Sequence, residues 1–314
     1  MLDVTRLRVL VAVARHGSVT AAAHALNYAQ PSVSHHIARL EAETGARLTQ
    51  RAGRGIRLTD AGRLLAERAE EIIGRLDAAE NELAAHIGLR GGRIRLAAFP
   101  SALGTIVPAA AARLEAEHPG MDLTLTEAEP PEAVRMLRAG YVDVALVFRH
   151  TQDGADPAPS TDAEDSIRAR PLLDDPIYLV TQAGEPPLPA EPDLAAFADR
   201  RWIGGCERCR SHLLWQCQAA GFIPKVAFTT DDFVAVQALV AAGLGVTTLP
   251  GLALRAARHP GIQATALPGA RRQVLAMTYG EPPDQPAVLR FLDVLTLTVG
   301  AEHPAREPAT SRNA

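Results

Sequence analysis

The spacing of the apolar residues changes once along this chain, near residue 92, and divides it into two kinds of fold. Before that point apolar residues recur three and four apart, as in Leu7, Leu10 and Val11, which is typical of amphipathic helices. From Arg93 short alternating segments follow with helical segments between them, which predicts an α/β domain with a mostly parallel sheet. With 314 residues, 47% of them apolar, two or three globular units are expected.

Residues 3–58 are predicted to form three short helices and a two-stranded wing. The first helix ends at His16-Gly17, Ser18 caps a second helix of small residues, and a third opens at Gln30-Pro31 and ends at Thr44-Gly45. Residues 51–58 form a basic loop interrupted by glycines, as expected of a wing. Two helices joined by a short turn inside a basic segment are typical of a helix-turn-helix.

The charge is distributed unevenly along the chain. The net charge is −4, yet residues 1–65 hold nine arginines against four acidic residues, a local balance of +5. A basic head on an acidic body indicates a module that binds a polyanion. Because Lys225 is the only lysine among 32 basic residues, the choice of arginine over lysine carries little information by itself.

A long helix is predicted to follow the wing, from about Asp60 to Ile87 with Thr59 as its cap. Its apolar residues lie three, four or seven apart, which favours a dimer seam. The alternative is an ordinary amphipathic helix that lies on its own domain. The residues expected in the seam are Leu65, Ala69, Ile72, Leu76, Leu83 and Ile87.

Several functional classes are disfavoured. No apolar stretch is long and continuous enough for a membrane span, and the N-terminus lacks the pattern of a secretion signal, so a cytoplasmic protein is expected. Three cysteines make a disulfide framework improbable. The chain has no G-x-S-x-G, H-E-x-x-H or P-loop motif, so no enzymatic activity and no cofactor are expected.

The chain resembles the LysR-type transcriptional regulators over about residues 3–300. The resemblance is most specific in the head, and it includes Gly17-Ser18-x-Thr20-x-Ala22-Ala23, Gln30-Pro31-Ser32-Val33-Ser34, Ile37-x-x-Leu40-Glu41 and Leu58-Thr59-x-Ala61-Gly62. In the second half it includes Gly140-x-Val142-Asp143-x-Ala145 and Val240-Ala241-Ala242-Gly243-x-Gly245-Val246. The head departs from the family at Thr49, where Phe is common, and at His35-His36, where Arg-Gln is frequent.

The resemblance implies an overall α/β architecture in which a mainly α winged helix-turn-helix and a linker helix precede a two-lobed effector domain of the type 2 periplasmic-binding-protein fold. The implied boundaries are 1–58 for the DNA-binding domain, 59–90 for the linker helix and 91–300 for the effector domain. Lobe I is expected at about 91–162 and 268–300, and lobe II at about 163–267. Residues 151–166 are expected to form a mobile loop and residues 301–314 a disordered tail.

The third helix is expected to enter the major groove of DNA, with its polar side chains outward and Val33, Ile37 and Leu40 toward the core. Arginines of the wing are expected over phosphates or in the minor groove. The expected DNA-binding residues are Ser18, Thr20, Gln30, Pro31, Ser32, Ser34, His35, His36, Arg39, Arg51, Arg54 and Arg57.

The effector is expected between the lobes, where strand ends and helix N-termini converge. Arg149 is the one fixed positive charge among the candidates, so an acidic small molecule is the preferred effector class. Ser101 is expected to bind the effector because it ends the first strand and opens a helix, and Ala102 follows it. The resemblance to the family implies the other effector-binding positions, which are Glu129, Phe148, Arg149, Gly204, Gly205, Thr229, Thr230 and Thr247.

A C-x-x-C pair, Cys206 and Cys209, is followed by His212 and Cys217. This set could bind zinc or form a switchable disulfide, and the nearby arginines and helix start would lower thiol pKa values. Incidental buried thiols are the preferred interpretation, so no metal is expected, and a thiol- or zinc-sensing regulator stays as an alternative.

The sequence therefore predicts a ligand-responsive DNA-binding regulator. The expected partners are double-stranded promoter DNA, a small-molecule effector and further copies of the chain, as a dimer through the linker helix and a tetramer. The resemblance to the family implies dyad-symmetric DNA with a T-(11 bases)-A core. RNA polymerase is a candidate partner, and no membrane contact is expected. A soluble binding protein or enzyme on the two-lobed fold is the alternative of another class, but it leaves the first 88 residues without a role.

Overall fold

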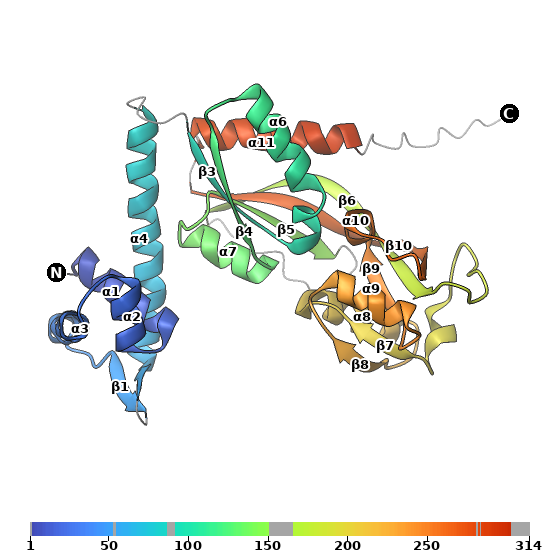
Figure 1. The fold of residues 1–314 in the computed structure, drawn as a ribbon, viewed down its shortest axis with the longest axis horizontal. Coiled ribbons are helices and arrows are strands. Elements are labelled where there is room, and N and C mark those ends of the chain that lie inside the picture. The colour runs from blue at the N-terminus through green and yellow to red at the C-terminus, as the bar shows by residue number, and fades with distance from the viewer. Residues whose placement is uncertain are drawn as a thin grey trace. The chain divides into compact units, whose positions relative to one another are not determined.

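The chain folds into two compact units, which are described separately here (Figure 1). The computed structural model describes residues 2–52, 55–86, 92–150, 166–280, 282 and 284–302. The N-terminal unit contains Met1–Gly91 and Arg135–Val142, and the C-terminal unit contains Gly92–Val134 and Asp143–Ala314. Within the described ranges, no helix is both long enough and apolar enough for a bilayer crossing.

The N-terminal unit has the helices and the hairpin that the sequence predicts. They are α1 (Val4–His16), α2 (Val19–Ala25), α3 (Gln30–Thr44), the antiparallel pair β1 (Thr49–Ala52) and β2 (Gly55–Leu58), and α4 (Asp60–His86). Ser18 caps α2 by accepting a hydrogen bond from the amide of Ala21 at 3.0 Å. Gly17 and Gly45 end α1 and α3 with φ of 64° and 67°, a conformation that favours glycine. Local sequence therefore sets the ends of these helices.

One apolar core joins α1, α2, α3 and the first half of α4. Leu10, Val33 and Leu40 are fully buried in it. The carboxylate of Glu41 on α3 accepts hydrogen bonds from the amides of Leu48 and Thr49, at 2.8 and 3.0 Å, and so connects α3 to the wing. The exposed side of α3 is thereby held in a fixed orientation with respect to the hairpin.

The long helix α4 presents two different apolar faces. Ala69 is buried in the core of the N-terminal unit and Leu65 packs against it, so these two residues do not belong to an exposed seam as the sequence predicted. Ile72, Leu76 and Leu83 are 45%, 39% and 62% exposed, and they form a separate stripe. Ile87, also expected in the seam, lies outside the described residues. The first turns of α4 therefore anchor it, and the later turns carry an uncovered apolar stripe.

The C-terminal unit is built around a six-stranded mixed sheet of order β4-β3-β5-β10-β6-β9. The expected parallel arrangement holds for β4-β3-β5, whereas β10 pairs antiparallel with β5 and β6, and β6 pairs antiparallel with β9. A second, two-stranded parallel sheet joins β7 and β8. The strands are β3 (Arg93–Ala98), β4 (Asp122–Glu127), β5 (Val144–His150), β6 (Ile167–Gln182), β7 (Arg201–Gly204), β8 (Lys225–Thr229), β9 (Thr247–Pro250) and β10 (Ile262–Tyr279).

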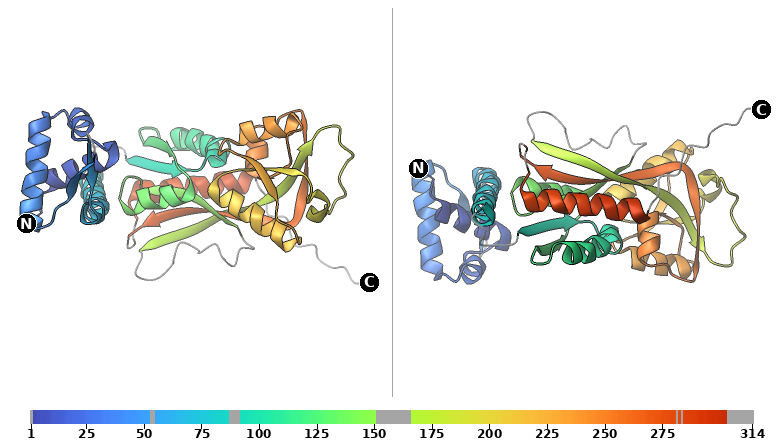
Figure 2. Two further views of the ribbon diagram at one scale, coloured as in Figure 1. Left: turned by 90° about the horizontal axis from the view of Figure 1, so that it is seen from below. Right: turned by 90° about the horizontal axis from the view of Figure 1, so that it is seen from above.

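Two long strands run through this unit and belong to both of its lobes (Figure 2). The C-terminal part of β10 pairs with β5, and the C-terminal part of β6 pairs with β9. The two strands pair with each other along most of their length. Sequence analysis predicted only Ile177–Thr181 and Val274–Thr278 as segments here, because Pro171, Pro176 and Pro268 interrupt the apolar pattern that marks a strand.

The remaining helices lie between these strands in sequence, except the last helix, which follows the last strand. They are α5 (Pro100–Leu103), α6 (Ile106–Glu117), α7 (Pro130–Arg138), the 3₁₀ turn Leu194–Phe197, α8 (Glu207–Ala219), α9 (Phe233–Ala241), α10 (Gly251–Ala256) and α11 (Pro286–Glu302). The last part of α7 belongs to the N-terminal unit. The helix α8 begins four residues earlier than predicted, so the C-x-x-C pair lies at its N-terminus. Ala301 and Glu302, which were predicted to be disordered, belong to α11, and the rest of the predicted tail lies outside the described ranges. The predicted loop 151–166 also lies outside these ranges, except for Ser166.

Each lobe has its own apolar core. The larger core gathers β3, β5, α6 and α11, with Leu96, Leu146 and Phe291 fully or almost fully buried. In the other lobe, Trp202, Leu213 and Cys217 form one cluster and Ile203, Val236 and Val240 another. Near the Gly140-x-Val142-Asp143 motif, the Asp143 carboxylate accepts hydrogen bonds from the amide and guanidinium of Arg95, which fixes the start of β5 beside β3.

We expect Gly62→Ala to destabilise the N-terminal unit. A Cβ atom at this position would lie 2.0 Å from the carbonyl oxygen of Leu48, and Thr59 holds the same junction through hydrogen bonds to Arg47 and Gly62. Because backbone must move to relieve the overlap, the free energy of unfolding should fall by about 1–3 kcal/mol. Urea unfolding monitored by circular dichroism measures this, with exposed Ala61→Ser as the control. Equal stability of the two variants would contradict the close approach.

Candidate functional site

The exposed side of α3 is polar along its first half. Gln30, Ser32, Ser34 and His35 are exposed there, as are Pro31 and Arg39, while Val33, Ile37 and Leu40 are buried beneath them. His36 differs from the prediction, because it is half-buried and its ring stacks on Tyr28 at a centroid distance of 6.0 Å. The helix therefore presents donors and acceptors near its N-terminus, where base edges are read in helix-turn-helix proteins.

The other predicted DNA-binding residues lie beside this face or in the wing. Thr20 and Arg57 are exposed, whereas Ser18 is half-buried and its hydroxyl already caps α2. Arg54 and the side chain of Arg51 lie outside what the structure describes. Whether these residues contact DNA stays a prediction, since the structure contains no nucleic acid.

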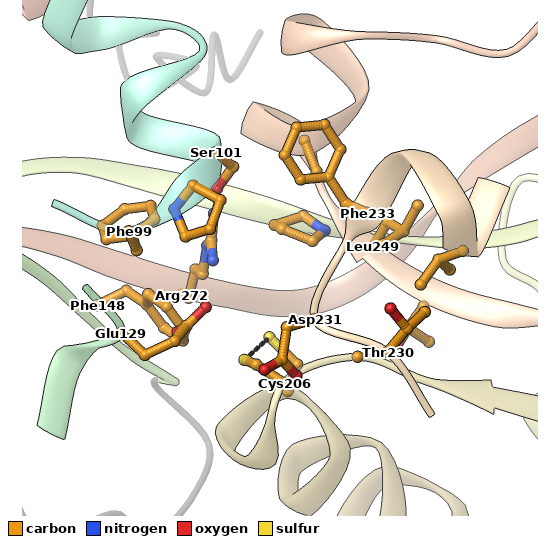
Figure 3. A pocket seen from close by; sticks show the side chains of 17 residues that line it. Phe99, Ser101, Glu129, Phe148, Cys206, Thr230, Asp231, Phe233, Leu249 and Arg272 are labelled. Carbon is orange, nitrogen blue, oxygen red and sulfur yellow. Dashed lines mark hydrogen bonds between the residues drawn. The ribbon is translucent and has the colours of Figure 1, made fainter. Parts of the chain in front are cut away.

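A small cavity lies between the two lobes of the C-terminal unit (Figure 3). Its volume is about 50 Å³. A single water molecule needs roughly 10–15 Å³ by the same measure, so only a few non-hydrogen atoms fit without movement of the walls. The lining residues are Phe99, Pro100, Ser101, Glu129, Phe148, Gly205, Cys206, Cys209, Thr230, Asp231, Phe233, Val236, Thr248, Leu249, Pro250, Ala253 and Arg272.

Arg272 on β10 forms one wall of the cavity, and its charge is compensated inside the protein. Its Nε donates to Oδ2 of Asp175 on β6 at 2.9 Å, and its Nη2 donates to Oγ of Ser101 at 2.8 Å. The guanidinium carbon lies 4.9 and 4.4 Å from the ring centroids of Phe99 and Phe148, a cation-π arrangement. Since the side chains of Arg272 and Asp175 are 2% and 3% exposed, this pair is buried.

Carboxyl groups supply the remaining charge of the cavity wall. Glu129 follows β4 and Asp231 precedes α9, and both line the cavity from different lobes (Figure 3). Burial raises the pKa of Glu129, while a hydrogen bond from the Cys206 thiol and the charge of Arg272 lower it. Its Oε2 atom is buried and has no hydrogen-bond partner in the described structure. The cavity therefore offers an unused acceptor but no uncompensated positive charge among its described lining residues.

The structure brings only some of the predicted effector residues to the cavity. Ser101, Glu129, Phe148, Gly205 and Thr230 line it, and whether they bind an effector stays a prediction. The other predicted residues, which are Ala102, Arg149, Gly204, Thr229 and Thr247, are not part of the lining.

Two of these other predicted residues have hydrogen-bond partners outside the cavity lining. Arg149 donates to Oε1 of Gln273 from its Nε and Nη2, at 3.0 and 2.6 Å, along the β5-β10 pair. Thr247 donates its hydroxyl hydrogen to the carbonyl oxygen of Ile203 at 2.7 Å. Arg149, the residue behind the expectation of an acidic effector, is not part of this lining, and the class of effector stays a prediction.

Arg272 and Asp231 were missed by the sequence analysis. Arg272 follows Arg271 in a segment without a recognisable motif. Only the alternation of side chains along a strand distinguishes the two arginines, because Arg272 lies on the same face of β10 as the buried residues Val274 and Ala276. Asp231 stands beside Asp232, the residue that caps α9, so its type carried no sign of a cavity.

The cysteine and histidine set does not form a metal site in the described structure. Cys206 and Cys209 are adjacent, with their sulfur atoms 2.9 Å apart, whereas Cys217 is buried in the separate core of Trp202 and Leu213. No group of three His, Cys, Asp or Glu residues in the described ranges could hold a metal ion. The zinc site considered from the sequence is therefore not supported, and the thiol pair remains.

A buried histidine pair lies near this cavity. The ring of His150, at the end of β5, stacks on that of His212 on α8, with 3.8 Å between centroids and 9° between planes. Burial, with smaller contributions from His212, Arg272 and Arg208, lowers the pKa of His150 to about 2. His150 therefore stays neutral at physiological pH and contributes as an apolar ring between the lobes.

We expect His150 to make the protein acid-sensitive. In the unfolded chain this residue titrates near 6.5, so below that pH the unfolded state binds more protons than the folded state, and stability is lost as pH falls. The cost is about 1.4 kcal/mol for each pH unit below 6.5. Urea unfolding at pH 7.5 and 5.5 should show a smaller loss for His150→Phe than for the natural chain. The exposed His24→Asn control should keep the full loss, and an unchanged slope in His150→Phe would contradict the assignment.

Comparisons with known proteins agree with the architecture of both units. Residues 4–63 match the bacterial regulatory helix-turn-helix protein, lysR family, and residues 88–298 match the LysR substrate binding domain. The probable HTH-type transcriptional regulator LrrA of Synechococcus elongatus is 29% identical over 302 residues, which cover 95% of this chain and 97% of the relative. The HTH-type transcriptional regulator TfdS of Cupriavidus pinatubonensis is 28% identical over 305 residues, 93% of this chain and 97% of the relative.

Solved structures share the same fold. The full-length LysR-type protein CbnR, crystallised with its target DNA, superposes with a TM-score of 0.65 at 22% identity, over 95% of this chain and 100% of that one. At that identity the likeness shows the fold alone. Because the two family matches together cover most of the chain, this protein belongs to the LysR family of DNA-binding transcriptional regulators with an effector-binding domain.

Proposed function

We propose that this regulator reads its operator through the first half of α3 and responds to a small molecule held in the cavity between the lobes. The observation that carries the first part is the exposed polar side of α3 on a rigid apolar core, inside a head with a net charge of +5. Phosphate contacts would position the helix, and side chains such as Gln30 would read base edges. The reported DNA complex of CbnR supports this use of the fold.

We propose further that the chain works as a dimer through α4 and as a tetramer. Ile72, Leu76 and Leu83 form an apolar stripe that nothing in the described chain covers. A second copy of the same helix would bury that stripe and present two α3 helices to the two halves of a dyad-symmetric operator. The first turns of α4 are already used within the N-terminal unit, so the pairing would use the later turns.

The effector of this proposal carries a positive charge or a strong hydrogen-bond donor on a small body. Glu129 offers a buried acceptor without a partner, and Asp231 adds a second carboxyl group. The positive charge of Arg272 is already balanced by Asp175, so a carboxylate ligand would gain little from it. An amine at Glu129 would stabilise the carboxylate against the desolvation that raises its pKa. This proposal replaces the acidic effector expected from the sequence.

Binding at this position could change the closure of the lobes, because the two carboxyl groups belong to opposite walls. A ligand that bridges them favours the closed arrangement only if it binds that arrangement more tightly. The same difference in affinity would then appear as a change in operator affinity.

The DNA part predicts two distinguishable defects. Gln30→Ala should cost about 1–3 kcal/mol on the operator and almost nothing on unrelated DNA, because it removes a base contact. Arg39→Ala should weaken binding to both sequences and reduce the slope of log affinity against log salt by about one, because it removes a phosphate contact. Fluorescence anisotropy with the upstream region of the protein's own gene measures both.

Arg113→Ala is the matched control, since Arg113 is a partly exposed arginine on α6 whose ion pair is local, with Glu117. It should leave both affinities and both salt slopes unchanged. If Gln30→Ala and Arg39→Ala behave like this control, α3 is not the DNA-reading helix.

The effector part predicts a preference between charge types. In a thermal-shift assay on the full-length protein, a panel of small primary amines such as ethylamine should raise the melting temperature more than the matched carboxylates, such as acetate. Glu129→Gln should remove that preference, whereas Glu127→Gln, the same change on the exposed end of β4, should keep it. Stabilisation by carboxylates alone would overturn the proposed effector class.

The affinity for such an amine should also depend on pH in a defined direction. Because burial raises the pKa of Glu129, a fraction of this group is protonated near the raised pKa, and binding of a cation must release that proton. Amine binding should therefore weaken as the pH falls through the raised pKa. Isothermal titration with the best amine at several pH values measures the effect, which Glu129→Gln should abolish.

A further inference from the structure

The N-terminus of α8 places two thiols in direct contact at the junction of the lobes. The Cys206 thiol donates to the Cys209 sulfur with 2.9 Å between the two Sγ atoms (Figure 3). Both side chains line the cavity, and Cys206 is 6% exposed. Sequence spacing alone could not show this contact, because a C-x-x-C pair brings its sulfurs together only when the local backbone allows it.

Cys206 also joins the two lobes. It precedes α8, which belongs to one lobe, yet it packs into the apolar core that contains Leu96, Phe148 and Phe291 of the other. Glu129, which follows β4, is the other acceptor within reach of this thiol, so Cys209 and Glu129 are alternative acceptors for its single hydrogen. A chemical change at this sulfur therefore acts on a contact between the lobes and on the charged wall of the cavity together.

We propose that Cys206 and Cys209 form a reversible disulfide that a hydroperoxide produces, so that the regulator has a redox input at the cavity in addition to its effector. The contact between the sulfurs carries this inference. A disulfide needs the two sulfur atoms at about 2.05 Å, so closure from 2.9 Å requires a movement of less than about 1 Å. Formation of the disulfide does not depend on the proposed function. Only its effect on operator binding rests on that function.

Cys209 is the attacking group in this reaction. The hydrogen bond from Cys206 lowers the pKa of the Cys209 thiol, burial opposes this, and the charge of Arg272 adds to the lowering, while the same hydrogen bond and burial raise the pKa of Cys206. The Cys209 sulfur attacks the hydroperoxide, the O–O bond breaks, and a sulfenic acid and an alcohol (water, if hydrogen peroxide reacts) form. Two electrons pass from sulfur to the peroxide in this step.

The second step closes the pair. The Cys206 sulfur attacks the Cys209 sulfenic sulfur, the S–O bond breaks, and water leaves with the Cys206 proton. The sum is two thiols and one hydroperoxide converted to one disulfide, one alcohol and one water. A small dithiol reverses the change by thiol-disulfide exchange.

The disulfide alters the cavity because it removes the Cys206 hydrogen. Glu129 then loses the possibility of the Cys206 hydrogen bond, which lowers its pKa. Burial, which raises the pKa of Glu129, is then opposed less strongly. Cys206 must also shift within the core that it shares with the other lobe. Both effects disfavour the arrangement of the lobes that the reduced pair stabilises, which gives the oxidation a route to the DNA-binding state.

Cys217 provides the matched control. It lies on the same helix, but it is buried in a different core, and burial raises its pKa to about 12, so it should not react. The chain has three cysteines, so each can be replaced singly by serine in the full-length protein.

The test counts thiols before and after a brief treatment of the reduced protein with hydrogen peroxide. The natural chain and Cys217→Ser should each lose two thiols and about 2 Da of mass, and dithiothreitol should restore both. Cys206→Ser and Cys209→Ser should lose no such pair. Retention of all three thiols in the natural chain, or a disulfide that includes Cys217, would overturn the proposal.

Operator binding is the second measurement, and it separates the chemistry from its consequence. Oxidation should change the operator Kd of the natural chain and of Cys217→Ser by about fivefold or more, the lower range of ordinary allosteric coupling. Cys206→Ser and Cys209→Ser should show no change under the same treatment. A disulfide that forms without any change in operator Kd would overturn the redox input, whereas loss of operator binding by every reduced protein would instead contradict the DNA-reading role of α3.

Discussion

The buried ion pair between Arg272 and Asp175 is the interaction on which the C-terminal unit depends. The two residues lie directly opposite each other on β10 and β6, the strands that belong to both lobes. Asp175 also accepts a hydrogen bond from the amide of Leu252 at the start of α10, and Arg272 donates to Ser101 at the start of α5. One pair thus fixes both long strands and two short helices around the cavity. Removing either partner would leave an uncompensated buried charge, at a cost of about 3–5 kcal/mol, so the pair is not available to bind an effector by exchange.

The pairing of Arg272 with Asp175 determines which charge the cavity can offer to a ligand. A cavity with a free arginine would favour carboxylates, but here the guanidinium is enclosed by Asp175, Ser101 and two aromatic rings. Apart from Arg272, the ionisable oxygen groups of the lining are the carboxyl groups of Glu129 and Asp231, and Oε2 of Glu129 has no hydrogen-bond partner in the described structure. The charge of the ligand that the cavity prefers therefore depends on which side-chain charges are already paired inside the protein. The sequence shows which charged residues lie near strand ends, but it does not show which of them are paired.

The sequence predicted the N-terminal unit more closely than the cavity, because the contacts that define the N-terminal helices are local and those that define the cavity are not. Helix ends there depend on neighbouring residues, such as Ser18 with Ala21 and Gly45 in the left-handed region, and these interactions are visible in the sequence. The residues around Arg272 come from segments far apart in the chain, and Arg149 and Arg272 cannot be told apart without strand pairing. The two long antiparallel strands were predicted only in part because prolines interrupt them, and α8 was predicted to begin too late because a cysteine is an unusual cap. The apolar spacing of α4 was read correctly as helical, but spacing does not say which turns a domain covers, and Leu65 and Ala69 belong to its own core.

The thiol pair and the proposed effector would use the same wall of one small cavity, and this has a thermodynamic consequence. Glu129 is an alternative acceptor for the Cys206 hydrogen when the pair is reduced, and it is also the acceptor offered to a ligand. If oxidation changes the affinity for the ligand, the ligand must change the tendency of the pair to oxidise by the same factor, because the two equilibria share one cycle. An amine that holds Glu129 ionised would also favour the state in which Cys206 keeps its hydrogen bond. Effector and redox state would then be read as one combined signal at the junction of the lobes, rather than as two independent inputs.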